Sequence, residues 1–202
     1  MTAALSNLDR QLVREKILEK YARVAVTPAG CFQYPTGVEG IRALGYEEEW
    51  WQDFPAEVLN SFCGVGNPFS LGQIHPGEKV VDVGCGAGFD ALVAARLAGS
   101  EGEVVGVDLS PEMVGRAQAH QAALAAGRVR FLAGEAEALP VPDAWADVVL
   151  SNGVYNLTVD KEKALREAYR VLKPGGRLLL ADMVLVRPLP PEQADRLDNW
   201  HR

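Results

Sequence analysis

Three glycines at alternate positions follow an apolar run in Lys79-Val-Val-Asp-Val-Gly-Cys-Gly-Ala-Gly-Phe-Asp90. Gly84, Gly86 and Gly88 have no Cβ atom, so the backbone can turn sharply there and a ligand can approach it closely. A helical pattern follows directly, and the N–H groups that open a helix face such a ligand. The stretch therefore predicts a strand, a tight turn and a helix N-terminus that together bind a nucleotide-like ligand.

Acidic residues follow the next two predicted strands. Asp108 ends the second strand roughly 20 residues after the glycine loop, where a carboxylate is placed to accept hydrogen bonds from ribose hydroxyls. A turn-forming role for Asp108 is the alternative. The third strand leads into Gly134-Glu-Ala-Glu-Ala-Leu-Pro140, whose acidic side chains reach the same edge of the sheet. Because ligands of open α/β sheets bind at the carboxyl ends of the strands, we expect an adenine group there.

The glycine spacing indicates which nucleotide is bound. Nicotinamide and flavin enzymes favour Gly-x-Gly-x-x-Gly, whereas this loop is Gly-x-Gly-x-Gly and is preceded by Asp82. Carboxylates such as Asp82 and Asp108 would repel a pyrophosphate, but they tolerate a cofactor that carries an ammonium and a sulfonium group. The pattern favours S-adenosylmethionine, with a nucleotide-dependent oxidoreductase as the less favoured alternative.

The elements that must position these residues alternate regularly from residue 79 onward. Strands are predicted at 80–83, 103–107, 129–132, 146–151 and 177–183, and helices at 89–98, from Pro111, and at 160–172. Ser110 is the expected N-cap of the helix that begins with Pro111. Strands that are nearly all apolar and that alternate with helices predict a buried parallel sheet in an α/β fold.

The N-terminal part of the chain has a different character. Residues 7–26 repeat apolar side chains at helical spacing and predict an amphipathic helix. Residues 27–78 are rich in glycine, proline and aromatic residues, with short helices expected near 38–44 and 56–62. We expect residues 1–78 to form a helical and irregular cap segment and residues 79–202 to form the cofactor-binding domain. The last dozen residues have the pattern of one short helix.

Composition limits the classes of protein and of partner. The 202 residues are 48% hydrophobic and 23% charged, which is typical of a soluble globular chain. A net charge of −7 argues against a nucleic-acid surface. No apolar stretch approaches the roughly 20 residues that span a membrane, and no signal peptide is visible, so the cytoplasm is the expected location. Cys31, Cys63 and Cys85 are an odd number without paired spacing, so neither a disulfide framework nor a metal site is expected.

Several motifs resemble those of known enzymes. Asp82–Gly88, Gly106–Asp108, Gly134–Pro140 and Arg170–Arg177 resemble class I S-adenosylmethionine-dependent methyltransferases. Gly64–Pro68, Asp108–Met113 and Ser151–Leu157, followed by Asp160-Lys161, resemble arsenite methyltransferases in particular. The resemblance implies a Rossmann-like, mostly parallel sheet with the strand order 3-2-1-4-5, preceded by an N-terminal helical segment. It also implies methyl transfer from S-adenosylmethionine to a small molecule.

The resemblance further implies a set of cofactor-binding residues. Gly84, Gly86 and Gly88 line the amino-acid part of the cofactor, together with Cys85 of the same loop and Asp82, which precedes the loop. Asp108 holds the ribose, Leu109 and Met113 pack on adenine, and Glu135 and the Ala136 amide meet the adenine edge. Asn152 lies beside the methionine part, and Tyr34 and Asn67 close over the cofactor.

The chain departs from the arsenite methyltransferases in its cysteines. Those enzymes bind As(III) through several thiolates, because a soft ion needs soft ligands. Gly153 stands where the family has a cysteine after the fourth strand, and Cys85 in the glycine loop has no expected catalytic duty. Cys31 and Cys63 remain as candidate ligands of a two-thiolate As(III) site. Burial as structural cysteines is the alternative for both.

The second departure is length. The family continues past the fifth strand through a reversed pair of strands and a further domain, and we expect this chain to lack the last two strands. The fifth strand would then be an exposed edge, which a homodimer or a terminal helix would cover. A truncated pseudoenzyme or interaction subunit that binds S-adenosylmethionine without transferase activity is the alternative function.

Overall fold

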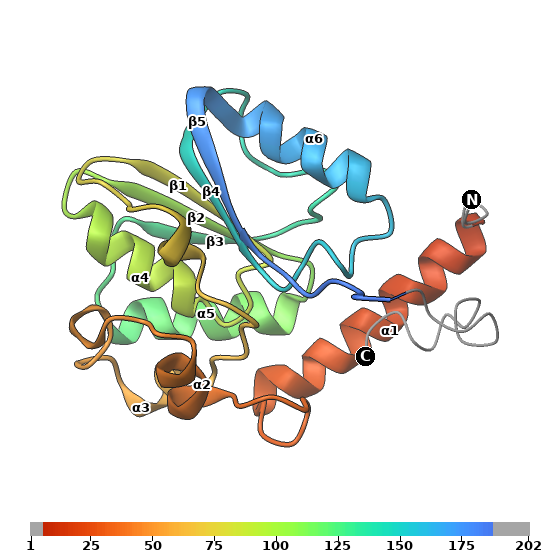
Figure 1. Ribbon diagram of the computed structural model, residues 1–202, viewed down its shortest axis with the longest axis horizontal. Helices are drawn as coiled ribbons and strands as arrows, with labels where there is room; N and C mark the ends of the chain where they lie inside the picture. Colours follow the sequence, from red (N-terminus) through yellow and green to blue (C-terminus); the bar gives the residue numbers. More distant parts are fainter. Residues whose placement is uncertain (1–5, 188–202) are drawn as a thin grey trace.

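Five parallel strands form the centre of the computed structural model, which describes residues 6–187 (Figure 1). The strands are β1 (Lys79–Val83), β2 (Glu103–Asp108), β3 (Val129–Ala133), β4 (Ala146–Asn152) and β5 (Leu172–Ala181). Their order in the sheet is β3-β2-β1-β4-β5. This order confirms the predicted Rossmann-like sheet.

The strand register brings three strand ends together. Val83 at the end of β1 lies beside Val107 of β2 on one side and Ser151 of β4 on the other. Because the strands are parallel, the residues that follow β1, β2 and β4 all emerge at the same edge of the sheet.

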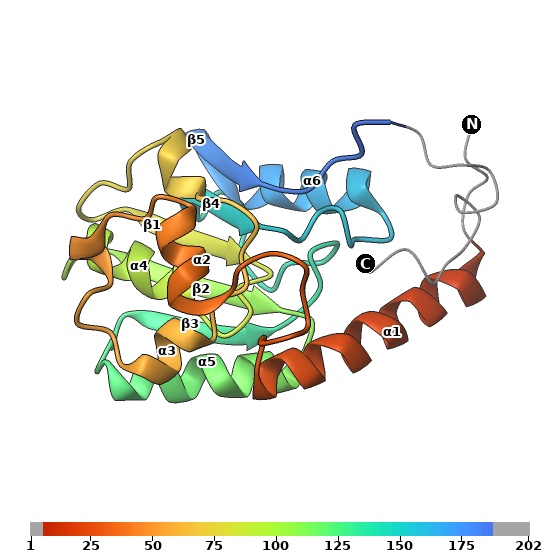
Figure 2. The ribbon, with the colours of Figure 1, turned by 60° about the horizontal axis from the view of Figure 1, so that its bottom comes forward.

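Helices cover both faces of the sheet. The helices α4 (Phe89–Ala98) and α5 (Pro111–Ala123) lie on one face, and α6 (Lys161–Val171) lies on the other (Figures 1 and 2). Val80 belongs to the apolar cluster on the α4 side, whereas its neighbour Val81 belongs to the cluster on the α6 side. Because alternate side chains of a strand point to opposite faces, a sheet buried on both faces needs apolar residues at every position.

The N-terminal segment consists of α1 (Asn7–Val26), α2 (Gly37–Ala43), η1 (Glu48–Trp50), α3 (Ala56–Asn60) and η2 (Pro68–Leu71). Aromatic rings attach this segment to α4. The ring of Phe89 meets the rings of Tyr46 and Phe62 in edge-to-face contacts, with centroids 5.5 and 5.0 Å apart. The long helix α1 lies beside α5 near its C-terminal end and extends away from the sheet toward the N-terminus (Figure 2).

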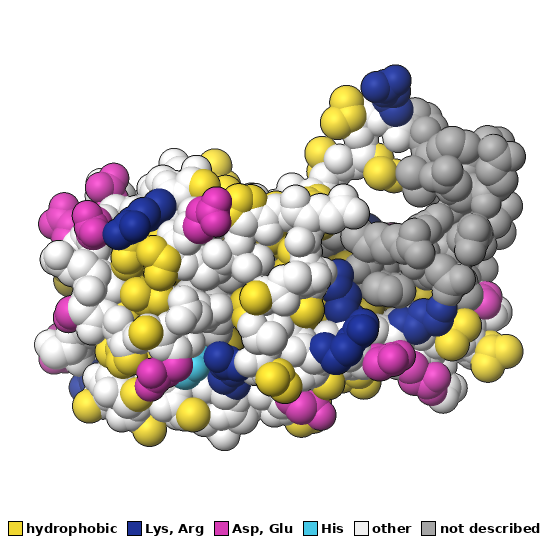
Figure 3. Space-filling view, turned by 90° about the horizontal axis from the view of Figure 1, so that it is seen from below, with side chains coloured by type: hydrophobic (Ala, Val, Ile, Leu, Met, Phe, Trp, Pro, Cys, Tyr) yellow, Lys and Arg dark blue, Asp and Glu magenta, His cyan; other side chains and the backbone are white. Residues whose placement is uncertain are grey.

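The face formed by α1, α3 and α5 carries both kinds of charge. Lys and Arg side chains gather toward α1, with Asp and Glu side chains beside them (Figure 3). None of the helices in the described part of the chain is both long and apolar enough to cross a bilayer.

The end of the sheet differs from the prediction. The strand β5 begins at Leu172 rather than at 177, because Leu172 already pairs with Ala146. Pairing resumes between Arg177 and Val148, so residues 173–176 form an irregularity within the strand. Within residues 6–187 no strand follows β5. The helix predicted in the last dozen residues lies outside the described residues.

Candidate functional site

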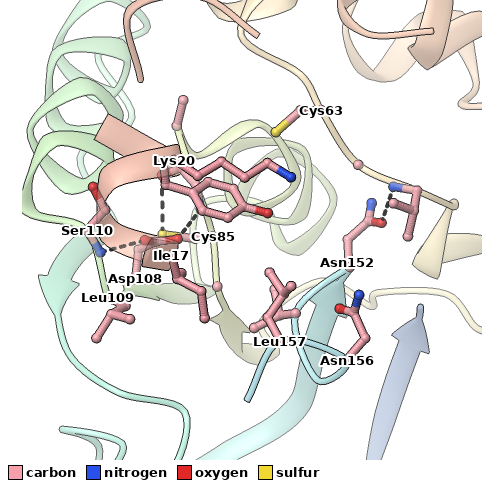
Figure 4. Close-up of a pocket in the computed structure, with 18 of the residues that line it drawn as sticks. Ile17, Lys20, Cys63, Cys85, Asp108, Leu109, Ser110, Asn152, Asn156 and Leu157 are labelled. Carbon is pink, nitrogen blue, oxygen red and sulfur yellow. Dashed lines mark hydrogen bonds between the residues drawn. The ribbon is translucent and has the colours of Figure 1, made fainter. Parts of the chain in front are cut away.

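A cavity of about 780 Å³ opens at the carboxyl ends of β1, β2 and β4. The glycine loop and the ends of these strands form its floor, and side chains from α1 and from the segments 30–34 and 61–65 close it from the other side (Figure 4). Most of the residues that the sequence singled out meet here. They are Cys31, Tyr34, Cys63, Asp82, Gly84, Cys85, Gly86, Asp108, Leu109, Glu135, Ala136 and Asn152.

The glycine loop has the backbone conformation that the sequence predicts. Gly84 and Gly86 have φ values of +70° and +52°, in the left-handed region that favours glycine. A Cβ atom on Gly84 would lie 2.1 Å from a methyl group of Val154, whereas a Cβ atom on Gly86 would meet no atom within 4 Å. Gly84 is therefore required by packing, and Gly86 leaves its backbone open to the cavity.

Asp108 is fixed by the loop that it faces. Its carboxylate accepts hydrogen bonds from Gly86 N at 2.8 Å and from Ser110 N at 2.9 Å. Burial raises the pKa of Asp108, and these amide donors work in the opposite direction by stabilising the charged form. The contacts hold a carboxylate at the end of β2 in one orientation.

Two further carboxyl groups, those of Asp82 and Asp90, lie at the floor of the cavity. Asp90, in the first turn of α4, accepts hydrogen bonds from Tyr46 Oη at 2.8 Å and Asn152 Nδ2 at 2.9 Å. Burial raises the pKa of Asp90 to about 6. Burial, together with the charges of Asp90 and Asp108, also raises the pKa of Asp82, whose Oδ2 is buried without a hydrogen-bond partner. These shifts favour the neutral carboxyl groups in the empty cavity, and a cationic group bound beside them would stabilise the charged forms.

Sequence reasoning missed both Asp90 and Tyr46. Asp90 stands two residues after Gly88 in the first turn of a predicted helix, and that position was a usable signal for a residue that faces the ligand. Tyr46 lies in the irregular cap segment, and no spacing rule connects it to Asp90.

Asn152 joins the cavity floor to the cap segment. Its side-chain carbonyl accepts hydrogen bonds from Val65 N at 2.8 Å and Gly66 N at 3.1 Å. A Cβ atom on Gly64 would lie 2.3 Å from Asn152 Nδ2, so this close approach requires glycine. The end of β4 is thereby fastened to the loop that follows Cys63.

Two thiols line the other end of the same cavity. Cys31 and Cys63 are partly buried together beside Tyr21 and Phe32, and Tyr34 Oη donates a hydrogen bond to the carbonyl of Cys63 at 3.1 Å. Burial raises the pKa of the Cys63 thiol to about 12. In the part of the chain described, no group of three or more His, Cys, Asp or Glu residues could hold a metal ion.

Three of the expected cofactor residues lie outside the cavity lining. Asn67 uses its side chain to cap η2, accepting from Phe69 N and donating to Gly45 O. Met113 is only 1% exposed and packs in a cluster that includes Val24 at the end of α1. A Cβ atom on Gly88 would lie 2.7 Å from the Phe131 ring, so Gly88 serves the packing of the loop on β3. That Asn67, Met113 and Gly88 touch the cofactor stays a prediction, and the structure places all three outside the cavity lining.

The turn after β3 has a role that the sequence did not indicate. Glu135 forms an ion pair with Arg14 of α1 at 2.6 Å, and Glu137 accepts a hydrogen bond from Val159 N at 3.1 Å. Both carboxylates line the cavity, and Glu135 ties α1 to this end of the sheet.

The polar groups that line the cavity fit a cofactor that carries an ammonium, a ribose and a sulfonium. The unpartnered Oδ2 of Asp82 can accept a hydrogen bond from an ammonium, Gly86 gives its backbone room, and Asp108 presents a fixed carboxylate. A parallel sheet in this order, with such a loop and an acidic cavity over it, defines a class I, Rossmann-like methyltransferase fold.

Residues 74–202 match the family described as methyltransferase domain, and the chain belongs to that family. Within it, the chain is close to the arsenite methyltransferases. It is 36% identical to the arsenite methyltransferase of Halobacterium salinarum, over 93% of this chain and 51% of that protein.

Other relatives have different acceptors in their names. The chain is 43% identical to the ubiquinone/menaquinone biosynthesis C-methyltransferase UbiE of Pasteurella multocida, over 54% of this chain and 41% of that protein.

Among solved structures, the arsenic (III) S-adenosylmethionine methyltransferase of Chlamydomonas reinhardtii is 39% identical with a TM-score of 0.59, covering 72% of this chain and 48% of that one. The chain thus spans about half the length of the arsenite methyltransferase of H. salinarum.

Proposed function

We propose that this chain binds S-adenosylmethionine in the cavity and transfers its methyl group to a small acceptor held near Cys31 and Cys63. One observation carries the proposal: the acidic glycine-loop end and the thiol-bearing end open into a single cavity. Bound S-adenosylmethionine supplies an electrophilic methyl group on a sulfonium. The chain supplies proximity, alignment and exclusion of water.

Each end of the cavity has a separate task in this proposal. Asp108 accepts hydrogen bonds from the ribose hydroxyls, and Asp82 and Asp90 hold the cationic amino-acid part. Residues 1–78 act as a cap that closes over the domain formed by 79–202.

As(III) is the acceptor that the thiols favour. A soft trivalent arsenic ion prefers thiolate ligands, and Cys31 and Cys63 line the same cavity as the glycine loop. A thiolate-bound arsenic atom keeps a lone pair, so it attacks a methyl carbon without a general base. No histidine lines the cavity in the described part of the chain, and this reaction needs none.

Binding of the cofactor without transfer is the second candidate. Gly153 lines the cavity without contributing a thiol, which leaves two sulfur ligands where arsenite methyltransferases use more. Such a chain would hold S-adenosylmethionine tightly and methylate nothing.

Calorimetry and labelled-methyl transfer separate these functions. We expect calorimetry to show tight binding of S-adenosylmethionine and weak binding of NAD; preferential binding of NAD would refute the proposal. Incubation with labelled S-adenosylmethionine and As(III), thiol or small-metabolite acceptors should label at least one acceptor. Tight cofactor binding without any labelled product would establish the second candidate.

Cysteine variants test the arsenic site. Cys31→Ser and Cys63→Ser should each abolish As(III) binding, whereas Cys85→Ser, which changes the buried thiol of the glycine loop, should retain it. Retained As(III) binding in both of the first two variants would exclude the two-thiolate site.

A homodimer is the partner proposal for the edge of the sheet. Within the described residues the outer edge of β5 pairs with no strand, and an uncovered edge is a template for pairing. Sedimentation equilibrium should show a dimer at micromolar concentration; a monomer at all concentrations would refute this pairing.

A further inference from the structure

Lys20 projects from α1 into the thiol-bearing end of the cavity, and the proposed methyl transfer gives it no task (Figure 4). Its Nζ atom lies 4.8 Å from the centroid of the Phe32 ring. A cation over an aromatic face at this distance is held by the quadrupole of the ring. The ammonium group is therefore directed by the cap segment rather than extended into solvent.

The surroundings of Lys20 are mixed in charge. Burial lowers its pKa, as does the nearby Arg23, whereas Cys31 and Cys63 act in the opposite direction. The thiols are thus close enough to the ammonium to interact with it electrostatically. Figure 4 shows the Lys20 side chain extending beside the Cys63 sulfur.

The groups around the Cys63 thiol act on its ionisation in both directions. Burial and the charges of Asp108 and Asp90 oppose its ionisation, and Cys31 adds to that effect, whereas Lys20 favours the thiolate. Tyr21 and Tyr34, the other titratable groups beside Cys63, have pKa values raised mainly by burial and are neutral at physiological pH. Because the thiolate is the form that acts as nucleophile and as metal ligand, an ammonium beside Cys63 directly affects its reactivity.

We infer that Lys20 is a positioning residue whose ammonium activates the Cys63 thiol toward soft electrophiles, As(III) among them. The As(III) part of this inference rests on the proposed function, but the thiol activation does not. When two thiols replace two hydroxyl groups of As(OH)₃, two As–S bonds form, two As–O bonds break and both thiol protons leave in water. Lys20 keeps its proton throughout, and its positive charge stabilises the negative charge that develops on sulfur.

Site-resolved alkylation tests the inference without any activity assay. The rate of carbamidomethylation of Cys63 by iodoacetamide would be measured by peptide mass spectrometry from pH 6.5 to 9.5. We expect Lys20→Met to slow alkylation of Cys63 by about tenfold at each pH, which corresponds to a thiol pKa about one unit higher. Lys20→Arg should restore most of the rate. Lys16→Met, one turn earlier on α1 and outside the cavity lining, is the matched control and should react like the native protein.

Two outcomes would overturn the inference. If Lys20→Met leaves the alkylation rate of Cys63 unchanged, the ammonium does not activate the thiol. If Lys20→Arg is as slow as Lys20→Met while circular dichroism shows both folded, Lys20 acts through shape and not through charge.

An As(III)-binding titration of the same variants separates this inference from the proposed function. Slow alkylation in Lys20→Met, together with no As(III) binding even by the native protein, supports the activation by Lys20 and refutes arsenic as the acceptor. Native As(III) binding with unchanged alkylation in Lys20→Met refutes the inference and leaves the proposed function in place.

Discussion

The side-chain amide of Asn152 donates a hydrogen bond to Asp90 Oδ2 at 2.9 Å, and this contact joins the end of β4 to the first turn of α4 beneath the cavity. The same side chain accepts hydrogen bonds from Val65 N and Gly66 N. Asn152 therefore links Asp90, at the acidic floor of the cavity, to the loop that carries Cys63. A substitution in the cavity floor should therefore affect the loop that carries Cys63, and a substitution in that loop should affect the floor.

Replacing Asn152 should destabilise the protein and weaken the binding of S-adenosylmethionine. In Asn152→Ala the part-buried amides of Val65 and Gly66 lose their acceptor, and each unpaired donor should cost about 1–2 kcal/mol, toward the lower part of the range for a fully buried group. Urea unfolding should show a loss of about 2–4 kcal/mol. Asn156→Ala is the control, because Asn156 Oδ1 is buried without a partner, so its removal should cost much less. Equal losses for the two variants would contradict the coupling role of Asn152.

Asp108→Asn should weaken cofactor binding by about 10- to 100-fold, since hydrogen bonds to a charged group contribute about 1.5–3 kcal/mol. The variant replaces an acceptor with a donor beside Gly86 N and removes the charge that faces the ribose position. Calorimetric titration with S-adenosylmethionine measures the change. Glu112→Gln, whose carboxylate accepts a hydrogen bond from the Ser110 hydroxyl on the outside of α5, should bind as the native protein does. An undiminished affinity in Asp108→Asn would remove Asp108 from the site.

Gly84→Ala and Gly86→Ala should separate packing from ligand access. Both residues have positive φ, which costs about 1–2 kcal/mol for alanine. The alanine at 84 also clashes with Val154, for a further loss of about 1–3 kcal/mol in urea unfolding. Gly86→Ala should remain folded and bind S-adenosylmethionine more weakly, as calorimetry would show. Similar stability losses in the two variants would be inconsistent with the structure.

The affinity for S-adenosylmethionine should rise with pH between about 5 and 7.5. Burial raises the pKa of Asp90 to about 6, so its carboxylate gains charge over this range and attracts the cationic cofactor more strongly. Asp90→Asn should flatten the pH profile of the dissociation constant. A profile as steep as that of the native protein would assign the titration to another group.

The raised pKa of Asp90 has the opposite effect on the stability of the fold: its contribution decreases as the pH rises. Because Asp90 binds its proton more tightly in the folded state than in the unfolded state, its contribution to stability is full below its unfolded pKa of about 3.9. That contribution is lost as the pH rises through the folded value. The unfolding free energy of Asp90→Asn should therefore depend less on pH between about 4 and 6 than that of the native protein.

The sequence by itself determined the sheet and the glycine turn. Apolar residues at consecutive positions such as Val80 and Val81 can only be buried if helices cover both faces, and the alternation of strands and helices then leads to a parallel order. The glycines and Asp108 follow strand ends, and parallel strand ends share one edge. These are local patterns, and the structure confirms them.

Only the tertiary structure decided how the cavity is completed. Tyr46 and Asp90 are 44 residues apart, and Asn152 reaches Asp90 across 62 residues. Met113 and Asn67 match family motifs, yet one is buried against α1 and the other caps η2, because a motif fixes a residue type and not the direction of its side chain. The position of Lys20 beside Cys63 likewise depends on how α1 packs against α5. Contacts between distant segments follow from the packing of the whole chain, and no local periodicity records them.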